Sequence, residues 1–174
     1  TMVAGDFSGI QKYIFAIYSA NFEKVTERLR ARSFYVDIIS RVFSQYVVDE
    51  FQVSRANILL QTGGKFYCLV PTSLDIDAKL EKIRNECDEH LYNAFHGEVS
   101  VNVASLSCQD NGLVDYSSTV VKVNERLGES KKNPFHAIIK DEGKWNPKAF
   151  VLIKDVAEKH LCKHCHIELI SEDH

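Results

Sequence analysis

The chain has 174 residues, of which 45% are hydrophobic, 26% charged and 10% aromatic. That composition is typical of one globular domain with a small appendage and excludes disordered and fibrous classes. The formal net charge is only −3, so any nucleic-acid surface would have to be local. No apolar run approaches the ~18 residues of a membrane-spanning helix, and the first residues lack the features of a secretion signal. We therefore expect no membrane attachment.

The chain opens with a strand, a tight turn and a helix. Residues 3–7 form a short, largely apolar run that contains Asp6 and leads into Ser8-Gly9. Apolar residues then recur with the i, i+3, i+4, i+7 spacing of one helical face at Ile10, Tyr13, Ile14 and Ile17. A second, longer helix is predicted over residues 25–47, where Arg32 interrupts the apolar stripe.

A hairpin follows the second helix. Residues 56–61 and 66–70 predict two strands, and Gly63-Gly64 between them can adopt the positive φ angles of a tight turn. Beyond the hairpin, residues 76–91 show helical spacing of apolar side chains.

The remaining pattern completes a known layout. Residues 99–103 alternate as a half-buried strand, residues 116–127 predict a weaker helix, and the polar residues 129–134 predict a loop or linker. Counting the two early helices as one gives βαββαβ, an α+β, ferredoxin-like antiparallel sheet with helices on one face. This is the palm layout of nucleotide cyclases with an extra N-terminal helix and a C-terminal appendage.

Nucleotidyl chemistry on such a palm needs two divalent metals, held by carboxylates at the end of the first strand and on the hairpin. Asp6 is placed to supply the first carboxylate. The hairpin continues with Lys65 and Phe66, which cannot bind magnesium. Residues 5–10 could instead face a phosphate at the start of the helix, although capping the helix is the alternative role for Asp6.

Four segments together resemble the large signature subunit of type III-A CRISPR effector complexes, in its first, degenerate palm domain. They are GDFSGIQKYIF at 5–15, LRARSFY at 29–35, SRANIL at 54–59 and GGKFY at 63–67. Because the chain begins so close to its first strand, we expect it to be part of a longer protein.

The resemblance implies a division of labour. The full subunit is expected to carry an HD nuclease domain for single-stranded DNA and a second palm whose Gly-Gly-Asp-Asp hairpin makes cyclic oligoadenylates from ATP, with Mg²⁺ or Mn²⁺, when target RNA is bound. The first palm lacks the acidic pair, helps to hold ATP at the interface of the two palms and is expected to be inactive alone. Partners would be other effector subunits, guide and target RNA, and single-stranded DNA. Carried over to this sequence, the nucleotide pocket and the degenerate hairpin comprise Asp6, Phe7, Ser8, Gly9, Ile10, Gly63 and Gly64.

Cys162 and Cys165 have the C-x2-C spacing of half a zinc knuckle. In the resembling family a second cysteine pair lies downstream, so we expect an incomplete Zn²⁺ site here. The resulting division is a palm over 1–128, a linker over 129–148 and the start of a zinc-binding region over 149–174. The other three cysteines lie within apolar patterns and are expected to be small buried residues, which favours a reducing, cytoplasmic location.

The second helix carries a basic cluster that has two interpretations. It comprises Lys24, Arg28, Arg30, Arg32 and Arg41, with acidic residues between them. A solvated face with ion pairs is the simpler interpretation, and contact with RNA or a partner is the other. Arg32 lies on the apolar stripe and is expected to pair with an acid or a phosphate.

Two other functions compete with the degenerate palm. A free-standing enzyme related to diguanylate cyclases would need acids on the hairpin, and Lys65 and Phe66 argue against it. A zinc-dependent adaptor that docks a protein or RNA would depend on Cys162 and Cys165.

Overall fold

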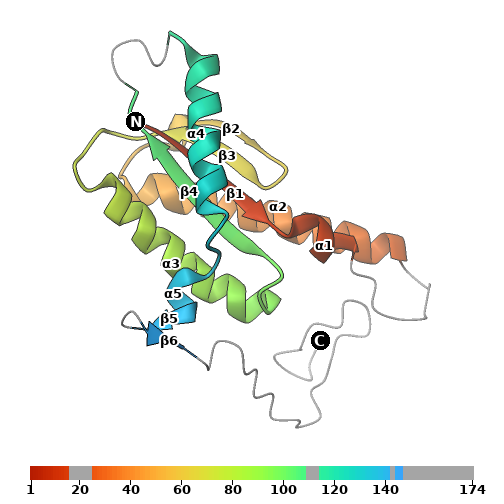
Figure 1. Ribbon diagram of the computed structural model, residues 1–174. Helices are drawn as coiled ribbons and strands as arrows, with labels where there is room; N and C mark the ends of the chain where they lie inside the picture. The colour runs from red at the N-terminus through yellow and green to blue at the C-terminus, as the bar shows by residue number, and fades with distance from the viewer. Residues whose placement is uncertain (16–24, 109–113, 142–143, 147–174) are drawn as a thin grey trace.

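The computed structural model of the chain describes residues 1–15, 25–108, 114–141 and 144–146 (Figure 1). The elements follow one another as β1 (Met2–Ser8), α1 (Ile10–Phe15), α2 (Val25–Glu50), the 3-10 turn η1 (Arg55–Asn57), β2 (Ile58–Thr62), β3 (Lys65–Leu69), α3 (Ile76–Phe95), β4 (Ser100–Leu106), α4 (Tyr116–Ser130), α5 (His136–Ile139), β5 (Lys140–Asp141) and β6 (Lys144–Trp145).

The main sheet has the strand order β2-β3-β1-β4, and all its neighbouring strands are antiparallel. This order arises because the β2–β3 hairpin inserts β3 beside β1, while the crossover through α3 brings β4 to the other edge of β1. The predicted α+β palm layout is confirmed. β5 and β6 form a separate two-stranded ladder.

Helices cover both faces of the sheet, because alternate residues of β1 project in opposite directions. Val3 and Phe7 belong to a core shared with α2 and α3. Met2 and Ala4 belong to a second core with Leu127 of α4, which crosses the front of the sheet in Figure 1. The expectation that helices lie on one face was therefore incomplete. An amphipathic pattern shows that a helix has an apolar side, but not which face of the sheet it covers.

Aromatic rings fill the core on the α2 side. Phe43 of α2 contacts Phe7 and Phe66 edge to face, with ring centroids 5.5 Å apart in both pairs. Such geometry is favourable because the positive edge of one ring meets the negative face of another. Cys68 is also fully buried, and burial raises its pKa to about 12, so the thiol stays protonated. Its predicted role as a small core residue is confirmed.

Two basic residues of α2, Arg32 and Arg41, make contacts within the domain. Arg41 Nε lies 2.8 Å from Asp37 Oδ2 on the exposed side of the helix, as expected for a solvated face. Arg32, expected to reach an acid or a phosphate, donates to the carbonyl of Tyr13 at 2.7 Å and lies 5.1 Å from the centre of its ring. This contact fixes α1 against α2. Along the described ranges no helix is both long and apolar enough to cross a membrane.

Two element boundaries differ from the sequence prediction. The strand predicted from residue 56 begins only at Ile58, because Ser54 accepts a hydrogen bond from the Ala56 amide and starts the 3-10 turn. Helix α4 continues to Ser130, so the predicted loop from residue 129 starts later. Gly128 was expected to end α4, but a single glycine is tolerated inside a helix, and α4 continues past it.

Candidate functional site

The end of β1 and the glycine hairpin touch each other. The Phe7 amide donates to the Gly64 carbonyl at 3.0 Å. Gly64 has φ +86°, and a Cβ atom on it would lie 2.3 Å from Ile10 Cδ1. A side chain at this position would have to displace the end of the Ile10 side chain, and the positive φ itself disfavours any residue but glycine. The predicted proximity of the hairpin to the end of the first strand is confirmed.

The turn between β1 and α1 also depends on a glycine. Gly9 has φ +88°, and a Cβ atom there would lie 1.9 Å from the backbone oxygen of Glu98. The Gly9 carbonyl accepts the Tyr13 amide at 2.9 Å, which is the first hydrogen bond of α1. The turn is thus packed against the chain that enters β4, and its position beside the hairpin is fixed.

The predicted pocket residues do not all face the same way. Asp6 and Ser8 project toward the side of the sheet that α4 covers, as Met2 and Ala4 do. Phe7 points into the opposite core, where its side chain is 6% exposed, and Ile10 packs against that core. Of the predicted pocket residues, only Asp6 and Ser8 therefore place polar side chains on the same face of the sheet, and the glycines contribute only backbone atoms.

Asp6 lies in the middle of a set of polar side chains from three strands and one helix end. In the sheet it pairs with Lys65 of β3 on one side and with Asn102 of β4 on the other. Lys131, directly after α4, forms an ion pair with Asp6 Oδ2. Because Asp6 lies within β1 and α1 begins only at Ile10, its alternative role as a helix cap is wrong.

Asn102 connects the two polar residues of β1. Its side chain is fully buried, and Nδ2 donates to Ser8 Oγ at 3.0 Å. Its Oδ1 has no hydrogen-bond partner among the described residues. A buried carbonyl oxygen without a donor is unfavourable, so this atom favours a ligand or water that donates to it or coordinates it.

The described residues do not fit a two-metal site. Divalent cations of this kind need several oxygen ligands, with carboxylates on both the strand end and the hairpin. Here Asp6 already has an ammonium partner, and its neighbour on the hairpin is Lys65. No cluster of three or more His, Cys, Asp or Glu side chains occurs in the described part of the chain. The predicted zinc ligands Cys162 and Cys165 lie outside the described residues.

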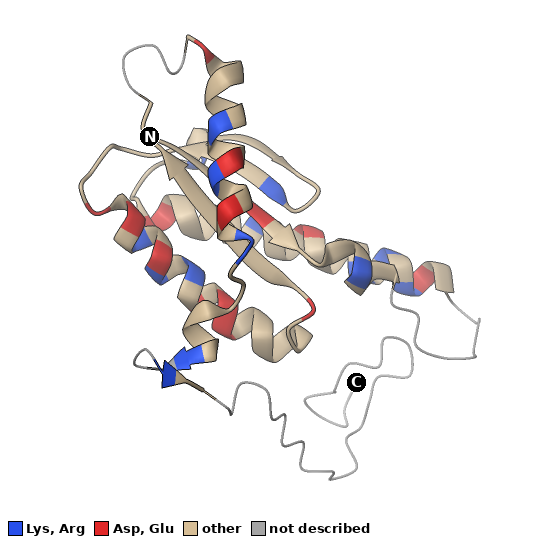
Figure 2. Cartoon of the chain, viewed as in Figure 1, with Lys and Arg blue, Asp and Glu red and all other residues tan. Residues whose placement is uncertain are grey.

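Sequence reasoning missed Lys131 and Asn102, and it did not place Lys65 beside Asp6. For Lys65 a signal existed: alternation along β3 puts it on the opposite face from the buried Phe66. Nothing local marks Lys131, which is 125 residues from Asp6 in the sequence. Figure 2 shows that the charged positions lie mostly on the helices. In the four strands of the main sheet the charged residues are Asp6 and Lys65.

A family model described as Csm1 subunit domain B matches residues 1–145. The chain belongs to this family. The match confirms the resemblance of the sequence motifs to the large subunit of type III-A effector complexes.

Curated relatives of this Csm1 domain are larger proteins. The chain is 33% identical over 112 residues to the CRISPR system single-strand-specific deoxyribonuclease Cas10/Csm1 (subtype III-A) of Methanocaldococcus jannaschii, covering 64% of the chain and 13% of the relative. It is 28% identical over 138 residues to the protein of that name from Enterococcus italicus, covering 77% of the chain and 18% of the relative. The chain thus spans less than a fifth of each of these two proteins.

Solved structures show the same Csm1 fold. A Csm1-Csm4 cassette in complex with AMPPNP superposes with a TM-score of 0.65 at 25% identity, covering 78% of the chain and 19% of the solved one. A Csm1-Csm4 cassette in complex with one ATP gives a TM-score of 0.62 at the same identity and covers the same shares of the two chains.

Proposed function

We propose that the chain is the first, degenerate palm domain of a type III-A CRISPR effector large subunit. In that role it forms one wall of an ATP site and supports neighbouring domains, while a second palm supplies the acidic hairpin. The contact between the Phe7 amide and the Gly64 carbonyl carries the proposal, because it joins the Ser8-Gly9 turn to the glycine hairpin. The similarity to cassettes solved with AMPPNP and ATP supports the choice of nucleotide.

The proposed partners have support from the same comparison. Solved neighbours include assemblies of Csm1 with Csm4, which supports a place for this domain in a multisubunit effector complex. We extend this to guide and target RNA and to single-stranded DNA, bound through the full subunit, and to a cytoplasmic location. A zinc site at Cys162 and Cys165, completed by further cysteines, remains part of the proposal.

The charge of the site favours a nucleotide over a neutral ligand. Lys131 forms an ion pair with Asp6, and Lys65, the neighbour of Asp6 in the sheet, has its ammonium 5.5 Å from the centre of the Tyr67 ring. At this end of the sheet two ammonium groups therefore stand against the single carboxylate of Asp6. Phosphate groups are suited to such a site because ammonium groups bind them as point charges.

An NMR titration of the isotope-labelled 174-residue chain with AMPPNP at millimolar concentration tests the nucleotide site. The largest amide shifts are expected at residues 8–10 and 63–65. Replacing Lys65 by Met should weaken binding by roughly threefold, the effect of one partly exposed charge. The matched control is Lys79→Met on α3, where the lysine pairs with Asp75 at 3.4 Å. Shifts confined to other elements, or none at all, would contradict the proposed site.

A further inference from the structure

The carboxylate of Asp6 occupies a position where palm domains with an active hairpin need a cation. Its side chain is 15% exposed and forms an ion pair with Lys131, whose side chain is 40% exposed. The ammonium of Lys131 therefore already neutralises this carboxylate. What holds Lys131 there decides whether the pair is a chance surface contact or a fixed part of the site.

Helix α4 fixes the approach of Lys131 from one side. Val123 and Leu127 are buried against the sheet, and the Tyr67 hydroxyl lies 2.9 Å from Asn124 Oδ1. These contacts hold α4 over β1 and β3. Because Lys131 is the residue that caps α4, its backbone position follows from the packing of the helix.

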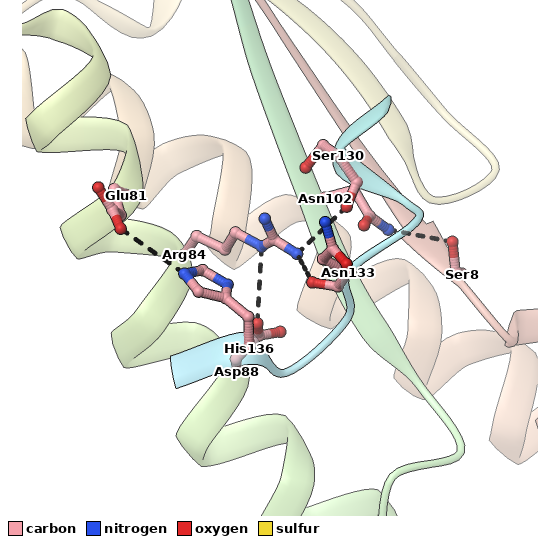
Figure 3. A network of polar contacts seen from close by, with 8 residues as sticks. All are labelled: Ser8, Glu81, Arg84, Asp88, Asn102, Ser130, Asn133 and His136. Carbon is pink, nitrogen blue, oxygen red and sulfur yellow. Dashed lines mark hydrogen bonds and ion pairs between the residues drawn. The ribbon is translucent and has the colours of Figure 1, made fainter. Parts of the chain in front are cut away.

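Arg84 of α3 fixes the backbone on both sides of Lys131. Its guanidinium donates to the carbonyl of Ser130, at 3.2 Å, and to the carbonyl of Asn133. Figure 3 shows Arg84 reaching from α3 to these two residues, with Asp88 beside its Nε. The chain that carries Lys131 is thus held between α4 and a largely buried arginine, which lowers the entropy cost of keeping the ammonium at Asp6.

The neighbouring lysine shows that the contact is selective. Lys132 pairs with Glu129, with Nζ 2.7 Å from both carboxylate oxygens, and both side chains are largely exposed. The two adjacent lysines therefore have different environments: one reaches a mostly buried carboxylate in the sheet, the other makes a solvent-exposed pair within one helix turn.

We propose that the Lys131 ammonium takes the place of a divalent cation on Asp6, so that this palm domain carries its cation as a side chain. Removing that ammonium would leave the Asp6 carboxylate with Asn102 opposite it in the sheet. The Oδ1 atom of Asn102 has no hydrogen-bond partner among the residues that the structure describes, and oxygens of these two kinds are the ligands that Mg²⁺ and Mn²⁺ prefer. The exchange rests on these contacts alone. Binding of a nucleotide phosphate by Lys65 and Lys131 belongs to the proposed function, and the exchange does not depend on it.

Binding of Mn²⁺ alone, without nucleotide, tests the exchange. Free Mn²⁺ is measured by electron paramagnetic resonance during titration of the 174-residue chain and its variants. Lys131→Met should bind one Mn²⁺ at least about tenfold more tightly than the unmodified chain, because a positive charge next to the site is lost. Lys132→Met, the matched control, should bind as the unmodified chain does.

Asp6→Asn provides the second arm of the test. In the unmodified chain this change should leave Mn²⁺ binding unaltered, and in the Lys131→Met background it should abolish the gained site. A Mn²⁺ site in the unmodified chain that Asp6→Asn removes would overturn the proposal, even if Lys131→Met failed to fold. An equal gain in Lys132→Met, or no gain in a folded Lys131→Met, would overturn it too. Since no nucleotide is present, these outcomes are independent of the AMPPNP titration.

Discussion

Asp88 of α3 is a carboxyl group without exposed surface, and its ion-pair partner Arg84 places Nε 3.6 Å from Oδ2. Burial raises the pKa of Asp88 above its ordinary 3.8, although the nearby charge of Arg84 acts in the opposite direction. The same Arg84 holds the backbone around Lys131. Asp88 therefore affects the candidate site through the arginine, without contacting Asp6.

Replacing Asp88 by Asn makes the sign of this pKa shift measurable. A carboxyl group whose pKa is raised by folding contributes most to stability below 3.8, and the contribution is lost as pH rises through the folded-state pKa. Asn does not titrate. The unfolding free energy of Asp88→Asn minus that of the unmodified chain should therefore increase as pH rises from about 4 to about 7. Chemical denaturation at several pH values measures it, and a constant or falling difference would show that Arg84 outweighs burial.

At the scale of elements, the sequence predicts the helices and strands better than it predicts what they cover. The spacing of apolar residues locates α2 and α3, and Gly63-Gly64 locates the hairpin, because these signals are local. The buried Asp88 lies on a helix whose pattern shows only an apolar stripe, so its burial was not predicted. The pairing of Asp6 with Lys131 depends on where α4 docks, and docking is set by contacts between distant parts of the chain.

Helix α4 is the element that links the second core to the candidate site. Leu127 is 1% exposed and packs with Met2, Ala4 and Tyr67 of the sheet. Truncating it to Ala should lower the unfolding free energy by about 3 kcal/mol, the usual cost of a buried leucine and the cavity that it leaves. Denaturant titration followed by circular dichroism measures this loss. Val121→Ala on the same helix, at a residue that is 55% exposed, should change stability by less than about 0.5 kcal/mol. Equal effects of the two changes would mean that α4 does not pack on the sheet as described.

At the scale of the whole molecule, the two cores on opposite faces of the sheet determine which side chains lie on the same face as Asp6. The core with α2 and α3 buries the odd-numbered positions of β1 and takes Phe66 from the hairpin. The face under α4 keeps Asp6 and Lys65. Of the two hairpin positions that would need to be acidic for metal binding, only position 65 can face Asp6, and it carries an ammonium group.

The chain should therefore make no cyclic or linear oligoadenylate when incubated with ATP and Mg²⁺ or Mn²⁺. Lys65 supplies no carboxylate, and Phe66 is fully buried, so a second metal ligand is missing from the hairpin. Chromatography with mass detection of the nucleotides measures any product. Asp6→Asn is the control, because a product made by a contaminating enzyme would persist in this variant. A product that appears with the unmodified chain and disappears with Asp6→Asn would instead support a cyclase-like enzyme that uses this carboxylate.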